Sequence, residues 1–243
     1  MDRSGMAFEA AQLLTNKEGI SAVTRTIAGA KITDVTVKPD AAEKIKKPAG
    51  RYITLEGEPF SQGMTSLLRR GLLQVIPPRG RLLAVGLGNP NITQDSLGSV
   101  CVRSMAARSG SRYSLAVIET DVSAKTGLET AGLVKAAAHE FGIDCIIAVD
   151  ALACANPDYI GKTVQISNAG IIPGSGTGAR SKELSREHLG IPIAAVGVPT
   201  VTALSTVTGK HDGRDYLVST SDSDTVIKIW AEVIAGAIED ILQ

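Results

Sequence analysis

Short apolar runs alternate with amphipathic segments along most of the chain. Buried strands are predicted where these runs have strand length and composition, at 82–85, 115–118, 145–149, 163–167 and 191–196. Apolar residues at helical spacing predict helices over 65–76, 95–108, 127–141, 182–189 and 222–242. In the third of these helices the predicted inner face consists of Leu128, Ala131, Val134, Ala138 and Phe141. Because alternating strands and helices are typical of α/β folds, we expect a largely parallel sheet with right-handed crossovers.

The first 60 residues follow a different pattern. A helix is predicted over 1–16, with an inner face formed by Met6, Ala10, Leu13 and Leu14. Residues Ile32–Val37 alternate with the strand period, and Tyr52–Leu55 is expected to pair with them. We therefore treat 1–60 as an N-terminal annex, a helix and a β-hairpin packed on the core, and 61–243 as the α/β core.

Composition excludes some classes of function. Lys plus Arg and Asp plus Glu number 25 each, so net charge predicts neither nucleic-acid binding nor attraction to a membrane surface. No apolar run is long enough to span a bilayer, and the first residues do not resemble a secretory signal. The three cysteines lack metal-site spacing and are predicted to be buried free thiols.

The stretch LLAVGLGNPNITQDSLG, from Leu82 to Gly98, carries the first candidate chemistry. It reads as a buried strand, a glycine-rich turn and the start of a helix, which places Asp95 at the carboxyl edge of the sheet. Asp150 ends the third predicted strand, in AVDALA. If these strands are parallel, both aspartates lie at the same edge of the sheet.

Two neighbouring carboxylates have three interpretations. A pair that shares a proton can activate water for attack on an amide, because close like charges raise the pKa of one member. The same pair could hold a divalent metal that lowers the pKa of bound water. Both aspartates could also act only as helix N-caps.

The second glycine-rich segment, PGSGTG (173–178), lacks the ending of a phosphate-binding loop, and a plain loop is favoured there.

Several segments together resemble the spore germination protease family, endopeptidases that degrade small acid-soluble spore proteins. The matching segments, in order, are RSGMAFEA (3–10), KPAGRYITLE (47–56), GLGNPNITQDSLGS (86–99), TGLETAGLVK (126–135), IIAVDALA (146–153), the stretch 164–201 and the C-terminal helix. The resemblance implies an α/β fold of the phosphorylase/hydrolase-like type, a three-layer sandwich with a mostly parallel central sheet. It also implies that Asp95 and Asp150 are the catalytic pair. For substrate binding we assign the two glycine-rich turns, through Gly88, Asn89, Asn91, Gly174, Ser175 and Gly176.

The resemblance leaves two alternatives open. The related hydrogenase-maturation endopeptidases bind a metal through acidic residues near these positions, so we expect no cofactor but keep a divalent metal as an alternative. A degenerate member could bind spore proteins without cutting them, since residues that flank the aspartates differ from the family pattern.

GLGNP also resembles the opening of peptidyl-tRNA hydrolase, but here the turn leads to Thr93-Gln94-Asp95 and to no histidine, which excludes that enzyme.

The family also implies a cellular setting. The expected partners are small acid-soluble spore proteins, with no nucleic acid and no membrane, and the expected assembly is a homo-oligomer in the cytoplasm of the forespore or spore core. Family members are made as zymogens, with a segment removed just before the part that resembles RSGMAFEA. Only Met1 and Asp2 precede that part here, so we expect no removable propeptide of the usual kind.

Overall fold

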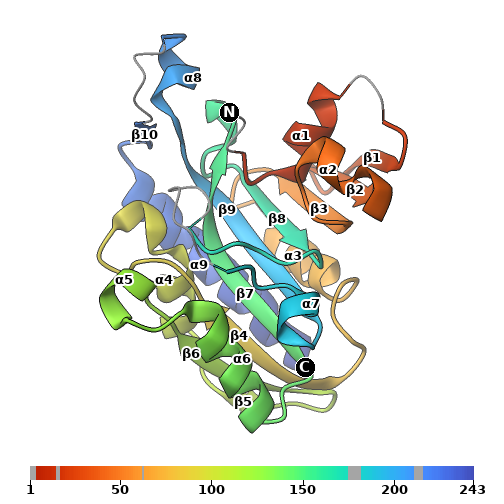
Figure 1. The fold of residues 1–243 in the computed structure, drawn as a ribbon, viewed down its shortest axis with the longest axis vertical. Helices are drawn as coiled ribbons and strands as arrows, with labels where there is room; N and C mark the ends of the chain where they lie inside the picture. Colours follow the sequence, from red (N-terminus) through yellow and green to blue (C-terminus); the bar gives the residue numbers. More distant parts are fainter. Residues whose placement is uncertain (1–3, 15–16, 62, 175–181, 211–215) are drawn as a thin grey trace.

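The structure is a computed structural model that describes residues 4–14, 17–61, 63–174, 182–210 and 216–243 (Figure 1). Its strands are β1 (Ile20–Ile27), β2 (Ala30–Val37), β3 (Gly50–Glu56), β4 (Gly80–Gly86), β5 (Arg108–Ser109), β6 (Tyr113–Glu119), β7 (Cys145–Cys154), β8 (Thr163–Ser167), β9 (Ile193–Ala203) and β10 (Leu217–Val218). Its α-helices are α1 (Ala7–Leu13), α2 (Ala42–Ile45), α3 (Met64–Leu72), α4 (Leu97–Arg103), α5 (Ser123–Thr126), α6 (Thr130–Glu140), α7 (Arg186–Leu189), α8 (Leu204–Thr208) and α9 (Ser223–Glu239).

One mixed sheet joins all of these strands, in the order β1-β2-β3-β8-β9-β7-β4-β6-β5, with β10 paired to β9. The four central strands β6, β4, β7 and β9 are parallel, and the other pairings are antiparallel. The α/β class is therefore confirmed, whereas the mostly parallel sheet is confirmed only at its centre. The connection from β7 to β8, residues 155–162, is shorter than a helical crossover requires, so β8 runs in the opposite direction.

Helices cover both faces of the parallel centre (Figure 1). Along β4, Leu82 and Ala84 face the core that contains α3, α4 and α9, while Leu83 and Val85 face α6 and α7. This alternation is the consequence of strand pleating, since successive side chains point to opposite faces. The terminal helix α9 buries Trp230 completely, and the Trp230 indole N–H donates to the Gly161 carbonyl at 2.6 Å.

The N-terminal strands extend this same sheet. The predicted partners Ile32–Val37 and Tyr52–Leu55 lie in β2 and β3, which pair antiparallel as expected, and β3 pairs on its other side with β8. The chain between them forms α2, and β1 adds an edge strand that the sequence analysis did not predict. Helix α1 packs against β2 and buries Phe8 and Ala10, and Met6, just before the helix, is buried in the same cluster.

Several predicted inner faces extend too far. Leu13, at the end of α1, is 71% exposed, and Leu128 and Phe141 are 58% and 62% exposed. The last two lie just outside the ends of α6, where the chain no longer follows the helical period. Arg108 lies in the short strand β5 rather than in α4.

The three cysteines are buried free thiols, as predicted. In the part of the chain that the structure describes, no helix combines the length and apolar character needed to cross a bilayer.

Candidate active site

Two glycines allow the turn after β4 to pack closely at the carboxyl edge of the sheet. A Cβ on Gly98, in the first turn of α4, would lie 2.3 Å from the Val149 carbonyl oxygen, so the helix begins directly against β7. Gly88 has φ +95°, and a Cβ there would lie 2.0 Å from the carbonyl oxygen of Asp95. Only a residue without a side chain fits this backbone contact, and the contact fixes where Asp95 sits.

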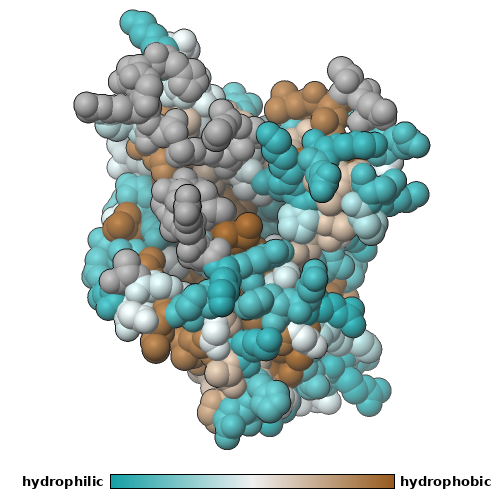
Figure 2. All heavy atoms as spheres, in the orientation of Figure 1, coloured by the Kyte–Doolittle hydropathy of each residue, from teal (hydrophilic) through white to brown (hydrophobic). Residues whose placement is uncertain are grey.

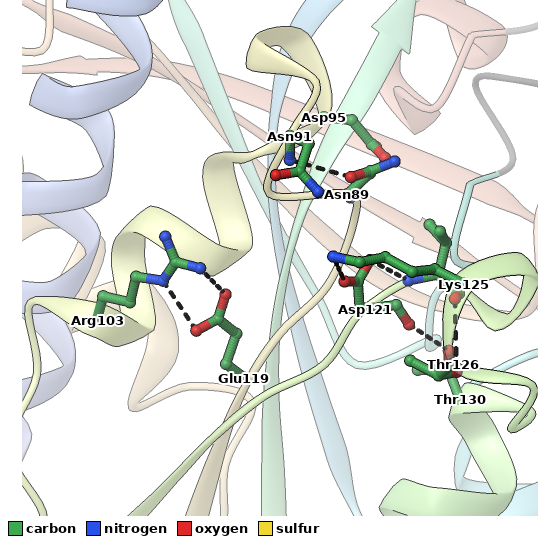
Figure 3. Close-up of polar contacts among 10 residues, drawn as sticks. Asn89, Asn91, Asp95, Arg103, Glu119, Asp121, Lys125, Thr126 and Thr130 are labelled. Carbon is green, nitrogen blue, oxygen red and sulfur yellow. Dashed lines mark hydrogen bonds and ion pairs between the residues drawn. The ribbon is translucent and has the colours of Figure 1, made fainter.

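The Gly88–Asp95 turn also holds the Asp95 carboxylate. The Asn89 backbone N–H donates to Asp95 Oδ2 at 2.7 Å, and the Asn91 N–H donates to Asn89 Oδ1 at 3.0 Å (Figure 3). Asp95 itself ends a short 3-10 helix, Thr93–Asp95. The predicted binding residues Gly88, Asn89 and Asn91 thus shape the turn that positions the carboxylate.

A β-bulge supports the other end of this turn. The register of β7 with β9 shifts after Leu152 and Pro199, which leaves Thr200 as an extra residue in β9. The Thr200 hydroxyl donates to the Gln94 carbonyl at 2.6 Å, and Ser219 donates to the Thr200 carbonyl at 2.7 Å. The residue before Asp95 is therefore anchored to the sheet.

Asp150 lies inside a strand rather than at its end. The predicted strand ends at Asp150, but β7 continues to Cys154, because the residues that follow pair with β9 and most of them are buried. Asp150 is 2% exposed, and its Oδ1 accepts a hydrogen bond from the Ala151 N–H at 2.9 Å. The same buried carboxyl also accepts a hydrogen bond from the backbone N–H of Gly174.

The two carboxyl groups interact electrostatically. Burial raises the pKa of Asp150 well above its ordinary value, and the charge of Asp95 raises it further, while the N–H groups of Ala151 and Gly174 lower it. Burial also raises the pKa of Asp95, the Asn89 N–H lowers it, and Asp121 raises it. Because burial is complete only at Asp150, a proton held by the pair resides on Asp150 and leaves Asp95 ionised.

A third carboxylate belongs to the surroundings of Asp95. Figure 3 shows Asp121 and Lys125 near the Asn89–Asp95 turn, joined by an ion pair between the Asp121 carboxylate and the Lys125 ammonium. This ion pair and the Val122 N–H lower the pKa of Asp121, so Asp121 stays charged. Burial raises the pKa of Asp95, and the negative charge of Asp121 raises it further. Asp121 precedes α5 and was not identified from the sequence.

A cavity of about 280 Å³ opens beside Asp95. Its described lining comes from the Asp95 turn, the ends of β7 and β9, β10 and Gly174, namely Ile92, Gln94, Asp95, Ala151, Leu152, Gly174, Thr200, Val201, Leu217, Val218 and Ser219. Asp95 and Gly174 are the predicted site residues in that lining, and Asp150 lies buried next to it. Ser175 and Gly176 lie outside the described residues.

The donor set around the aspartates consists of carboxylates and backbone groups. Within the described ranges, no three His, Cys, Asp or Glu side chains gather as a set of metal ligands. The aspartate pair can act as an acid and a base, since one member is half-buried at the cavity and the other is fully buried with a higher pKa.

Sequence reasoning missed the residues whose role depends on tertiary approach. The Thr200 hydroxyl bonds to the Gln94 carbonyl from the bulge in β9, and the charge of Asp121 acts on Asp95 from another segment of the chain. Pro199 was an available signal for the bulge, because proline inside a strand is typical of irregular pairing.

Comparison with known proteins identifies the family. The model of the germination protease family matches residues 4–226. The germination protease of Bacillus cytotoxicus is 34% identical over 251 residues, covering 88% of this chain and 68% of that protein. That of Halalkalibacterium halodurans is 34% identical over 236 residues, covering 87% of this chain and 63% of that protein.

The chain therefore belongs to the germination protease family, a family of spore proteases, which confirms the resemblance found in the sequence. It spans about two thirds of the length of these relatives.

Proposed function

We propose that this protein is an endopeptidase that hydrolyses small acid-soluble spore proteins during germination, with water activated by the Asp95–Asp150 pair. The observation that carries the proposal is the unequal environment of the two carboxyls. Asp95 is half-buried at the cavity, and Asp150 is 2% exposed with the more strongly raised pKa. Family membership supports a protein substrate, and the small acid-soluble spore proteins follow from the resemblance found in the sequence.

In this mechanism the ionised Asp95 is the general base. It accepts a proton from water as the water oxygen bonds to the scissile carbonyl carbon, and that proton passes to the amide nitrogen as the C–N bond breaks. Asp150 does not line the cavity, so it acts through Asp95. Its retained proton keeps the pair at a single negative charge and leaves the basic form on the member that reaches the cavity.

The remaining expectations for this chain stay predictions. They are a homo-oligomer in the cytoplasm of the spore, substrate contacts from the two glycine-rich turns, and the division into an annex (1–60) and a core (61–243). Gly174 carries the strongest structural support for a contact, because it both lines the cavity and donates to Asp150.

The test measures cleavage of a purified small acid-soluble spore protein by wild type, Asp95→Asn and Asp150→Asn. Asn is nearly isosteric with Asp but neither takes up nor releases a proton, so Asp95→Asn removes the general base and Asp150→Asn removes the partner that shares its proton. Each variant is expected to lose at least about 10²-fold in kcat/KM while keeping its circular dichroism spectrum. Asp158→Asn is the matched control, because Asp158 is exposed and its side chain accepts no hydrogen bond within the described residues. Near-wild-type turnover by a folded Asp95→Asn variant would refute the assignment.

Two further measurements separate the alternatives. Cleavage that persists in chelator supports the aspartate pair, whereas loss in chelator with recovery on adding a divalent metal supports the maturation-type mechanism. Wild type that binds the spore protein tightly and leaves it uncut would identify a non-catalytic member.

A further inference from the structure

Strand β7 runs past the end of its neighbour β4. The β4–β7 pairing stops at Gly86 and Val149, while the pairing of β7 with β9 continues to Cys154. The next segment along this edge is the turn that carries Asp95. From residue 150 onward, the edge of β7 that faces away from β9 has no strand beside it among the described residues.

The backbone groups on this open edge can be assigned. The Val149 carbonyl accepts from the Leu87 N–H at 2.9 Å, and the Ala153 carbonyl accepts from the Gly5 N–H at 2.7 Å. Because backbone groups alternate between the two edges of a strand, Ala151 must direct its own N–H and carbonyl to the same edge. The Ala151 N–H is held by Asp150 Oδ1, and no donor to its carbonyl is found within the described ranges.

The cavity reaches this edge. Ala151 and Leu152 point to opposite faces of β7, so a cavity lined by both must pass around the open edge between them. Asp95 lines the same cavity, so its carboxylate and the backbone of Ala151 border one space. An extended chain laid along the edge would therefore pass directly beside the general base.

The protein already uses this edge for an extended segment of its own. Gly5 donates to the Ala153 carbonyl, and the Gln165 side chain holds this segment by donating to the Gly5 carbonyl at 3.2 Å and accepting from the Ala7 N–H at 2.7 Å. A Cβ on Gly5 would lie 3.1 Å from the Leu152 Cβ, so the segment lies close against β7. Among the described residues, the position on this edge that stays open is the one at Ala151, which lines the same cavity as Asp95.

We propose that the substrate binds as an added β-strand, with a backbone N–H of the substrate donating to the Ala151 carbonyl. This inference rests on the proposed function and names how that site recognises its substrate. On the face seen in Figure 2, hydrophobic residues form several separate patches among hydrophilic ones. The occupant is a locally unfolded, extended segment of a protein, recognised through its backbone.

Backbone recognition sets a condition on the substrate. An N–H that is already bonded inside a helix or sheet cannot donate to Ala151, so only a segment without such structure of its own can bind. The protease would then cut chains that are unfolded at the cleaved position, whatever the fold of the rest.

The test is an N-methyl scan of a peptide that spans one cleavage site of a small acid-soluble spore protein. Each backbone N–H except that of the scissile bond is methylated in turn, and both kcat/KM with wild type and the affinity for Asp95→Asn are measured. At the position that pairs with Ala151, methylation removes the donor and sterically separates the strands, so both quantities should fall at least about tenfold. The residues on either side point away from β7, and their methylation should change both quantities less than about twofold.

The two readouts separate this inference from the proposed function. A loss of affinity at one position and not at its two neighbours, without any cleavage, supports strand addition and refutes the protease assignment. Cleavage of the unmodified peptide with equal effects, or none, at neighbouring positions overturns strand addition and leaves the protease assignment intact. Failure of the unmodified peptide to bind or be cleaved overturns both.

Discussion

Gly88→Ala is expected to disable the enzyme without unfolding it, although Gly88 bears no reactive group. Its φ of +95° disfavours a residue with a Cβ, which costs about 1–2 kcal/mol of folding stability. The larger effect is steric, because the new Cβ would lie 2.0 Å from the Asp95 carbonyl oxygen, whereas real Cβ contacts are essentially never below 3.0 Å. The two backbones must therefore separate by about 1 Å, and this movement displaces Asp95.

The displacement translates into a rate. Misplacing a reacting group by about 1 Å can cost about 10²-fold, which corresponds to about 2.7 kcal/mol in the activation free energy. The Asn89 N–H bond to the Asp95 carboxylate would be strained by the same movement. We therefore expect kcat/KM of Gly88→Ala to fall by about 10²-fold.

Gly190→Ala is the matched control for this variant. Gly190 has φ +82° at the end of α7, and a Cβ there would meet nothing within 4 Å. Gly190→Ala has the same backbone penalty of about 1–2 kcal/mol but no steric contact with Asp95, so it should lose only that much stability and keep wild-type kcat/KM. Urea unfolding and cleavage of a spore-protein substrate are measured for both variants. Equal activities of the two variants would show that the Gly88 contact does not position Asp95.

Two further outcomes are expected. Thr200→Val loses the hydroxyl that donates to the Gln94 carbonyl, so stability should drop by about 1 kcal/mol and cleavage should slow, whereas Thr202→Val loses a comparable bond to Cys154 and should keep its activity. Asp150→Asn should be more stable than wild type at neutral pH, because the carboxyl ionises freely in the unfolded chain while its raised pKa opposes ionisation in the native state. That advantage should shrink as pH falls and vanish below about 3.9, the unfolded pKa of aspartate, which thermal unfolding across pH would show. A stability difference that does not change with pH would contradict this account of the buried carboxyl.

The parallel centre of the fold could be predicted from sequence because its strands are covered on both faces. Leu82–Val85 and Cys145–Val149 are continuous apolar runs, and such runs are typical of buried parallel strands. The limits of β7 could not be predicted, since Asp150 interrupts the apolar run while pairing with β9 continues the strand to Cys154. Tertiary pairing, not local composition, decides where this strand ends.

The site was predictable to the extent that it depends on chain position. Asp95 follows a strand and a glycine-rich turn, and Asp150 lies on a neighbouring parallel strand, so convergence follows from topology. The contributions of Thr200 and Asp121 depend on contacts between segments distant in sequence, and no local pattern marks them. Likewise, the open edge at Ala151 exists only because β7 is longer than the apolar run that predicted it.

The most direct test of the central claim is a site-resolved NMR titration of the Asp150 carboxyl carbon in wild type and in Asp95→Asn. If the two aspartates form one coupled pair, the pKa of Asp150 lies well above the ordinary aspartate value in wild type. It then moves down in Asp95→Asn, because the neighbouring negative charge is gone, while burial keeps it above the ordinary value. An Asp150 pKa that is ordinary in wild type, or one that is unchanged by Asp95→Asn, would contradict the paired site.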